Sequence, residues 1–401
     1  MESIKKYILW LPGWYPNLIE PFAGDFIQRH AQAVSLYSEV VVIHVIRDIE
    51  GKITRRQKEV RNVVGRLTEI TIYYYVPPIG IKALDKAKSL IRHNSIARER
   101  IKELLTQKGF PDLSHVHVVN KNAWVARWLQ RKYSIAFVCS EQWTIYLQEA
   151  KPNFSSLPAV EKHSIKRLLK QALGISVVSD YLGQAIKKIV SSVNYEVIPN
   201  LVDPKKFYPE INIRKDPVKF IHISNLNYQK NFEDIALACS MIKTNKQNFV
   251  LDVYGPHTPY HLDYCEKLGI SQLIKFHGEI EHQQLSVMLR KSDALILYSR
   301  YETFGCVYIE AMASGVPVIS SDIPVAHEII RENFSGYFTE GENPEKLAEK
   351  MEWFINQTVG PDKKALAENA ASLYSPEFIG RRFINWYNAC LQAVPGNDYS
   401  H

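Results

Sequence analysis

The sequence of 401 residues is poor in cysteine and contains no long hydrophobic run. Its five cysteines are odd in number and scattered, without the spacing of a disulfide framework, which favours a reducing compartment. Because no run of about 18 apolar residues occurs, we predict no transmembrane helix. Residues 1–6 lead directly into a strand-like segment without the apolar region of a signal peptide, so we expect a cytoplasmic protein.

Several motifs that would place the chain in other classes are also missing. A tight G-x-G-x-x-G after the first strand would indicate a nicotinamide-dependent enzyme, but that loop reads Pro12-Gly13-Trp14. There is no Asp-x-Asp motif and the histidines are spread out, so we predict no metal site. No recognised nucleic-acid motif accompanies the positive net charge, and we expect no nucleic-acid partner.

What the sequence does contain is an alternation of strand-like and helix-like segments in both halves. A chain of this length is too long for one core, so the alternation predicts an α/β protein with two doubly wound domains. We expect a first domain over residues 1–203, a second over 204–375, and a last amphipathic helix within 376–401. The predicted strands are residues 7–11, 39–45, 70–76, 116–119, 135–139, 174–178, 196–198, 219–224, 249–254, 274–276, 294–297 and 316–319.

Positive charge is concentrated in the first half. Residues 1–210 hold about 31 basic and 19 acidic side chains, whereas the remainder is net acidic. Within residues 81–108, apolar side chains recur at helical spacing among lysines and arginines. Two interpretations stay open: a helix lying on an anionic membrane, or, with a slight preference, a helix packed on the core with its cationic face in solvent.

The most informative stretch runs from residue 301 to residue 319. An apolar strand is predicted just before it, and Glu302 falls in the loop beyond that strand, where open α/β sheets bind ligands. Gly305 allows the backbone to approach a ligand closely, and the amides of Gly305, Cys306 and Val307 begin a helix, which suits a diphosphate.

Glu310 lies eight residues after Glu302, about 12 Å along a helix, so the two carboxylates cannot share a proton. That separation is close to the distance between a sugar ring and the ribose of its nucleotide. Taken alone, the pair could equally be a surface loop residue and a helix residue facing solvent.

This stretch resembles the E-x7-E signature of retaining glycosyltransferases of the glycogen-synthase-like superfamily (glycosyltransferase family four, group 1). The resemblance implies the GT-B fold, in which two Rossmann-like domains face a central cleft and a C-terminal helix crosses back to the first domain. It also implies that Glu302 contacts the transferred sugar, that Glu310 holds the ribose, and that residues 304–307, beginning at Phe304, bind the diphosphate of a UDP- or GDP-sugar.

Further motifs extend the resemblance over nearly the whole chain. The segment 11–16, which contains Gly13, and the following Gly24-Asp25-Phe26-Ile27 are similar to the family's first glycine-containing loop, which faces the cleft. The resemblance implies a donor contact at Gly13 and an acceptor-side position for Gly24. Residues 198–207 are similar to the family's domain-boundary motif, and Gly278-Glu279 falls where its base-binding loop lies.

The sequence departs from the family where the second domain opens. Lys230 is retained, and we expect it to neutralise the leaving diphosphate, although it could also be an exposed lysine at a helix start. Asn225 occupies the position of the usual arginine, so one cation is missing. Either stabilisation of the leaving group is weaker or another basic residue supplies the charge.

In the first domain, His115-Val116-His117 resembles the family's HxH motif, whose second histidine lies beside the reacting centre. We therefore expect His117 in the catalytic site and His115 in a structural role. Residues 139–144 resemble a segment that commonly reads TEHWT, with Gln142, which cannot titrate, at the histidine position. We expect Glu141 and Gln142 on the acceptor side, although Glu141 could equally be a satisfied polar residue at a strand end.

The resemblance implies retaining transfer of a hexose-type sugar from a nucleotide sugar to a glycan or lipid-linked acceptor, without a metal or other cofactor. Catalysis would consist of stabilising the leaving diphosphate and holding both substrates together. The basic first domain favours an anionic or lipid-linked acceptor at the inner membrane face, as in surface polysaccharide assembly. The alternative is a non-catalytic GT-B protein that binds a nucleotide sugar or scaffolds a polysaccharide-synthesis complex.

Overall fold

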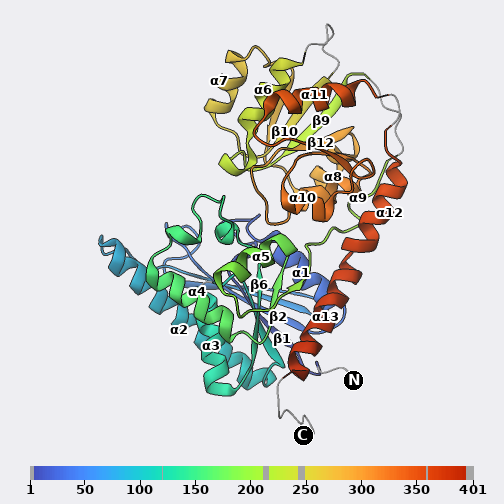
Figure 1. Cartoon of the computed structure of the whole chain (residues 1–401). Coiled ribbons are helices and arrows are strands. Elements are labelled where there is room, and N and C mark those ends of the chain that lie inside the picture. Colours follow the sequence, from blue (N-terminus) through green and yellow to red (C-terminus); the bar gives the residue numbers. More distant parts are fainter. Residues whose placement is uncertain (1–3, 120, 211–215, 243–248, 358–359, 394–401) are drawn as a thin grey trace.

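The computed structural model describes residues 4–119, 121–210, 216–242, 249–357 and 360–393. These residues form two α/β units, one above the other in Figure 1, each built on its own sheet. The last two helices, drawn in red, run from the second unit down along the first. The predicted architecture of two doubly wound domains with a returning C-terminal helix is confirmed.

The first sheet has eight strands in the order β3-β4-β2-β1-β5-β6-β7-β8. Its central strands are buried apolar runs because helices cover both faces. Along β1, Ile8 and Trp10 pack toward α1 and α13, whereas Leu9 and Leu11 pack toward α2 and α3. The strands are β1 (Ile8–Pro12), β2 (Val40–Arg47), β3 (Gln57–Val64), β4 (Leu67–Tyr74), β5 (Leu113–His117), β6 (Phe137–Glu141), β7 (Ile175–Val177) and β8 (Glu196–Val197).

Strand β3 was not predicted from the sequence. It pairs antiparallel with β4 at the edge of the sheet, and every one of its residues is exposed. Its charged side chains, among them Lys58, Glu59 and Arg61, hide the strand signal but suit an edge that must not pair with another chain.

The second sheet has six parallel strands in the order β11-β10-β9-β12-β13-β14. Strand β14 was missed because it is short and begins at a glycine, Gly336. The strands are β9 (Val218–Ile223), β10 (Phe249–Tyr254), β11 (Ile274–Gly278), β12 (Ala294–Leu297), β13 (Val318–Ser321) and β14 (Gly336–Thr339).

Helices connect the strands in both units and cover the faces of the sheets. The first unit has α1 (Asp25–Ser35), α2 (Lys82–Lys108), α3 (Lys121–Tyr133), α4 (Ala159–Gln171) and α5 (Asp180–Ile189), with short 3₁₀ turns η1 (Thr144–Tyr146) and η2 (Phe154–Ser156). The second has η3 (Tyr228–Lys230), α6 (Phe232–Met241), α7 (Pro259–Lys267), α8 (His282–Arg290), α9 (Cys306–Ala313), α10 (Pro324–Ile329), α11 (Pro344–Ile355) and α12 (Lys363–Tyr374). The last helix is α13 (Pro376–Gln392).

Helix α13 begins at the predicted Ser375-Pro376 step and packs against α1 of the first unit. Gly380 permits this approach, because a Cβ atom there would lie 2.3 Å from the carbonyl oxygen of Ala33. The same helix also meets the first sheet, where Tyr387 bonds His115 of β5 at 2.6 Å.

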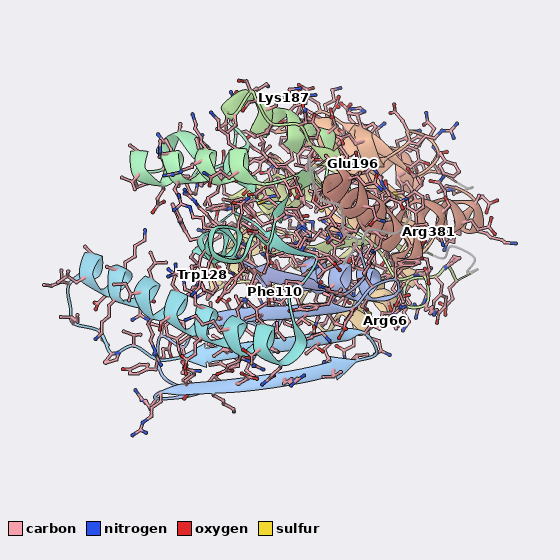
Figure 2. All side chains as sticks on the ribbon, turned by 90° about the horizontal axis from the view of Figure 1, so that it is seen from below. Arg66, Phe110, Trp128, Lys187, Glu196 and Arg381 are labelled. Atoms are coloured by element: carbon pink, nitrogen blue, oxygen red, sulfur yellow. The ribbon has the colours of Figure 1, made fainter. Side chains whose placement is uncertain are left out.

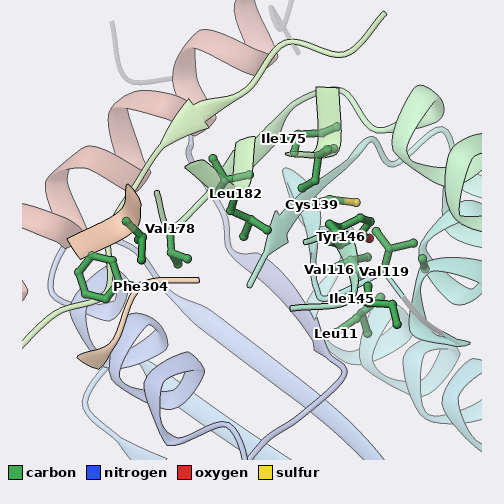
Figure 3. Packing of buried hydrophobic residues seen from close by; sticks show 14 of the residues in the cluster. Leu11, Val116, Val119, Cys139, Ile145, Tyr146, Ile175, Val178, Leu182 and Phe304 are labelled. Carbon is green, nitrogen blue, oxygen red and sulfur yellow. The ribbon is translucent and has the colours of Figure 1, made fainter. Parts of the chain in front are cut away.

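The two units also contact each other directly. Phe304 of the second unit lies beside Val178 of the first within one buried apolar cluster (Figure 3). Ser179 donates a hydrogen bond to the carbonyl of Thr303 at 2.6 Å, which ties the two units together next to that contact.

The basic segment forms helix α2, whose two halves differ in burial, and contact of this helix with a membrane stays a prediction. Its C-terminal half buries Ile96, Ile101 and Leu104 and lies over one face of the first sheet, where the helix contacts β2 (Figure 2). Its first turns leave Leu84 and Ile91 exposed. The core-facing interpretation therefore holds for the second half of the helix only.

Candidate functional site

The two units enclose a cavity of about 770 Å³ at the carboxyl ends of both sheets. The first unit lines it with the loop after β1, the start of α1 and the loop after β6; the second lines it mainly with the loop after β9, the loop after β11 and the start of α9. Residues that line it and bear on the chemistry are Trp14, Asp25, Arg29, Gln142, Trp143, Thr144, Asn225, Gln229, Lys230, Glu279, His282, Glu302, Phe304, Gly305, Cys306 and Val307.

Glu302 is held rigidly at this cavity by three neighbours. Its carboxylate pairs with the ammonium of Lys230 and accepts hydrogen bonds from Ser299 at 2.8 Å and Gln229 at 3.1 Å. Only 4% of the residue is exposed. A surface-loop role for Glu302 is therefore wrong, and so is an exposed helix-start role for Lys230, because the two side chains form a buried pair on the cavity wall.

The start of α9 presents free amides to the same cavity. Gly305 precedes the helix with φ 85°, and a Cβ atom there would lie 2.7 Å from the ring of Tyr308, so only glycine fits. The backbone N–H of Tyr308 donates to the carbonyl of Gly305. The amides of Gly305, Cys306 and Val307 come before this first hydrogen bond of the helix and are therefore free for a ligand. Burial raises the pKa of the Cys306 thiol to about 12, so the helix start carries no thiolate.

Glu310 is buried on α9 and reaches the cavity only through its partners. Arg29 and His282 each lie 2.8 Å from its Oε1 atom, and both of these residues line the cavity. Burial alone would raise the pKa of Glu310, but the hydrogen bonds and charges of His282 and Arg29 lower it to about 2. A solvent-facing role for Glu310 is therefore wrong, while its direct contact with a ribose stays a prediction.

The cations of the site come from both units. Lys230 and the neutral Asn225 line the cavity from the second unit. Arg29 of α1 lines it from the first unit. Sequence reasoning missed Arg29, because a single arginine in a helix carries no signal of its own. The only hint was that Arg29 follows Gly24 by five residues. Gly24 belongs to the segment that resembles the family's first glycine-containing loop.

His117 lies elsewhere than expected. Its ring is fully buried between Trp10 and His115, with ring centroids 4.0 and 3.9 Å away, and it does not line the cavity. Side chains two residues apart on a strand share a face, so His117 follows His115 toward the layer that α13 covers. The expected position beside a reacting centre is thus not the observed one. The histidine pair forms part of the packed core, where burial keeps the pKa of His117 well below its usual value.

The acceptor-side residues Glu141 and Gln142 have different surroundings. Gln142 lines the cavity, whereas Glu141 is buried beneath it and accepts hydrogen bonds from Val119 N–H and the Tyr146 hydroxyl, each at 2.8 Å. Burial raises the pKa of Glu141 to about 7. Glu141 therefore fixes the loops after β5 and β6, which agrees with the structural alternative for this residue.

Gly13, Gly24 and Gly278 shape the cavity through their neighbours and do not line it themselves. Gly13 donates to the carbonyl of His117 at 2.8 Å, and Trp14 beside it reaches the cavity. A Cβ atom at Gly24 would lie 2.6 Å from the backbone of Trp14, so glycine is required where α1 begins. Gly278 likewise accepts from Gly255 N–H at 2.9 Å and leaves Glu279 on the wall.

The described part of the chain offers neither a cluster of metal ligands nor a helix that could cross a membrane. No group of three or more His, Cys, Asp or Glu side chains among these residues is arranged to hold a metal ion. Within the same residues, none of the helices is both long and apolar enough to span a bilayer.

Comparison with solved structures defines the fold class. Sucrose-phosphate synthase from Thermosynechococcus elongatus superimposes with a TM-score of 0.74 over 97% of this chain and 100% of that one, at 17% identity. HepE from Anabaena, solved with UDP and glucose, superimposes with a TM-score of 0.67 over 96% of this chain and 100% of its own, at 15% identity. The chain has the GT-B fold.

Comparison by sequence points to a family within that class. Residues 204–373 match the family model described as "Glycosyl transferases group 1". An alpha-monoglucosyldiacylglycerol synthase from Streptococcus pneumoniae is 23% identical over 69% of this chain, and a glycogen synthase from Mycobacterium tuberculosis is 25% identical over 56% of it. The chain spans 64% and 55% of the lengths of these two relatives, respectively.

Proposed function

We propose that the protein is a retaining glycosyltransferase that moves a hexose-type sugar from a UDP- or GDP-sugar to a glycan or lipid-linked acceptor. The observation that carries the proposal is the buried Lys230–Glu302 pair beside the free amides of α9, all on one cavity wall. The family match over the second unit and the similarity to two glycosyl-transferring synthases support the same reaction.

In this proposal the donor lies across the start of α9. The amides of residues 305–307 and the ammonium of Lys230 hold the diphosphate, and Glu302 receives a hydroxyl of the transferred sugar. The loop at Glu279 also lines the wall and would contact the base. Since amides and cations already provide positive charge, we propose that the reaction needs neither a metal nor another cofactor.

The acceptor enters from the first unit. Trp14, Gln142 and Thr144 line that side of the cavity and offer an aromatic face and neutral hydrogen-bonding groups, which suit a sugar hydroxyl. The carboxylate on this side, Asp25, is paired with Arg29. The acceptor proton therefore passes to the departing diphosphate as the glycosidic bond forms on the same face of the sugar. The C1–O bond to the diphosphate breaks as the C1–O bond to the acceptor forms, which gives retention.

We also propose that the protein works at the inner face of a membrane, in the assembly of surface polysaccharide. The first turns of α2 expose Ile81, Leu84 and Ile91 beside Lys82 and Lys86, a combination that suits insertion among anionic headgroups. The similarity to the Streptococcus pneumoniae alpha-monoglucosyldiacylglycerol synthase supports an acceptor at a membrane.

A screen of nucleotide sugars tests the reaction. A donor that binds raises the apparent melting temperature by mass action, and the best UDP- or GDP-sugar should then be hydrolysed slowly in the absence of acceptor. Stabilisation by some nucleotide sugars with release of nucleoside diphosphate supports the enzyme. The presence of Asn225 in place of the usual arginine favours the alternative, a non-catalytic binder or scaffold, and binding without any turnover would establish that alternative instead.

A further inference from the structure

Arg29 is fixed at the junction of the two units by several partners. Its Nη1 atom donates to Glu310 at 2.8 Å and to the carbonyl of Leu201 at 3.2 Å, and its Nη2 atom lies 3.1 Å from a carboxylate oxygen of Asp25. The Nε atom is buried and has no hydrogen-bond partner among the described residues. The guanidinium is thus held in one orientation and retains donor capacity.

The position of this guanidinium is next to the start of α9. Arg29 lines the cavity together with Cys306 and Val307, and its charge acts on the Cys306 thiol, opposing the rise in pKa that burial causes. Since Cys306 is the first residue of α9, the arginine stands beside the amides that would receive a diphosphate.

The second unit alone has too little positive charge for such a group. A nucleoside diphosphate carries more than one negative charge, whereas Lys230 is already paired with Glu302 and Asn225 is neutral. Besides this shared ammonium, the second unit lines the cavity with Lys206, which is exposed, and with His282, which is held by Glu310. Among the described residues of the first unit that line the cavity, Arg29 is the one cation. Its side chain is largely buried beside the start of α9.

We propose that Arg29 supplies the second cation for the donor diphosphate. It would replace the arginine that is usual at the position of Asn225. The inference rests on the proposed function and assigns a donor-binding role to a residue of the unit expected to bind the acceptor. Glu310 then acts as a positioning residue, since it holds Arg29 and His282 at the cavity wall. Binding of donor would bridge the units, because Lys230 and Arg29 belong to different ones.

The arginine geometry suits this task. A planar guanidinium can bind a phosphate oxygen through one edge while its other edge remains on a carboxylate. Gly24 contributes by letting α1 begin directly against Trp14, which places Arg29 in the second turn of the helix and over the cavity.

Calorimetric titration of the full chain with UDP and GDP tests the assignment. Arg29→Gln should weaken binding of the preferred nucleoside diphosphate by about tenfold or more, because a charge-assisted hydrogen bond is lost. Adding Asn225→Arg to that variant should recover most of the affinity. A purely structural role for Arg29 would not be rescued by a new arginine on the other unit.

Two further variants keep the result interpretable. Arg29→Gln combined with Glu310→Gln removes both members of the pair, so the chain keeps no unpaired buried carboxylate there, and thermal unfolding should show that it folds. Arg381→Gln removes an exposed positive charge at α13, which lines no part of the cavity, and should bind like the wild type.

The outcomes separate this inference from the proposed function. A wild-type chain that binds neither UDP nor GDP overturns the proposed function and the inference with it. A wild-type chain that binds one of them, with Arg29→Gln binding equally well, overturns the role of Arg29 and leaves the proposed function standing. Loss of binding that Asn225→Arg fails to restore also contradicts the inference.

Discussion

Lys230 and Glu302 form a buried ion pair across the wall of the interdomain cavity, although they lie 72 residues apart in the sequence. Ser299 and Gln229 hold the carboxylate from other directions, so it stays oriented when the lysine moves toward a ligand. The pair links the residue that would contact the sugar to the residue that would contact its diphosphate.

Lys230→Ala should reduce turnover of the nucleotide sugar by about 10²–10³-fold, because one preformed charge facing the leaving group is lost. Kinetics with the best donor measures the effect, and thermal unfolding should show that the variant still folds, since Glu302 keeps its two hydrogen bonds. Lys187→Ala is the matched control, because Lys187 is exposed on α5 and lines no part of the cavity (Figure 2). Equal turnover in the two variants would contradict the assignment of Lys230.

Glu302→Gln should leave binding of the free nucleoside diphosphate nearly unchanged while lowering turnover. The neutral amide keeps the size of the side chain and can still accept the bond from Ser299, but it no longer offers a carboxylate to a sugar hydroxyl. Titration with UDP or GDP and a hydrolysis assay measure the two quantities. A variant that loses both to the same extent would show that Glu302 acts on the nucleotide and not on the sugar.

Gly305→Ala should abolish nucleotide binding and destabilise the fold by roughly 1–3 kcal/mol, through backbone strain at φ 85° and contact with the Tyr308 ring. Gly109→Ala is a suitable comparison, since Gly109 has φ 81° but open space around it. Urea unfolding and nucleotide titration of both variants measure these effects. If the two glycines tolerate alanine equally, the close fit at the start of α9 is not essential.

The exposed start of α2 should bind anionic vesicles at low salt, because apolar and basic side chains are combined there. Leu84→Glu together with Ile91→Glu should prevent flotation with vesicles that contain phosphatidylglycerol. Phe110→Glu serves as the control, because Phe110 is also exposed but lies beyond the other end of the helix, about 40 Å away. Absence of flotation by the wild type, or unchanged flotation of the double variant, would contradict the membrane contact.

Burial of Glu141 makes a prediction about pH. Its folded-state pKa of about 7 lies above the ordinary pKa of 4.5 for a glutamate, so the folded chain binds more protons than the unfolded chain between these values. This residue's contribution to stability is therefore greatest at low pH and falls as pH rises through 7, by roughly 3 kcal/mol in total.

Glu141→Gln, which cannot ionise, should lose that dependence, so its stability relative to the wild type should improve from pH 5 to pH 8. Urea unfolding at both pH values measures the difference. A constant difference between the two proteins would mean that Glu141 titrates normally.

The sequence predicted what depends on local pattern. The alternation of apolar runs gave the two doubly wound sheets, and residues 302–310 gave a carboxylate and a helix start at one cavity, because all of these features lie close together along the chain. Strand β3 escaped prediction because its charged residues lack the apolar alternation of a half-buried strand.

Positions that depend on packing between distant segments could not be predicted. The surroundings of the His115–His117 pair depend on α13, which is more than 250 residues further along the chain and packs Phe383 and Trp386 against His115. The place of Arg29 at the cavity depends on its ion pair with Glu310 of the other unit. In both cases the distant partner that determines the environment of the residue could not be read from the sequence.

The most direct test of the account is a crystal structure of the protein with UDP or GDP bound. We predict that the diphosphate lies over the amides of Gly305, Cys306 and Val307, with Lys230 on one side and Arg29 on the other. A diphosphate bound at any other place on the chain would contradict the account.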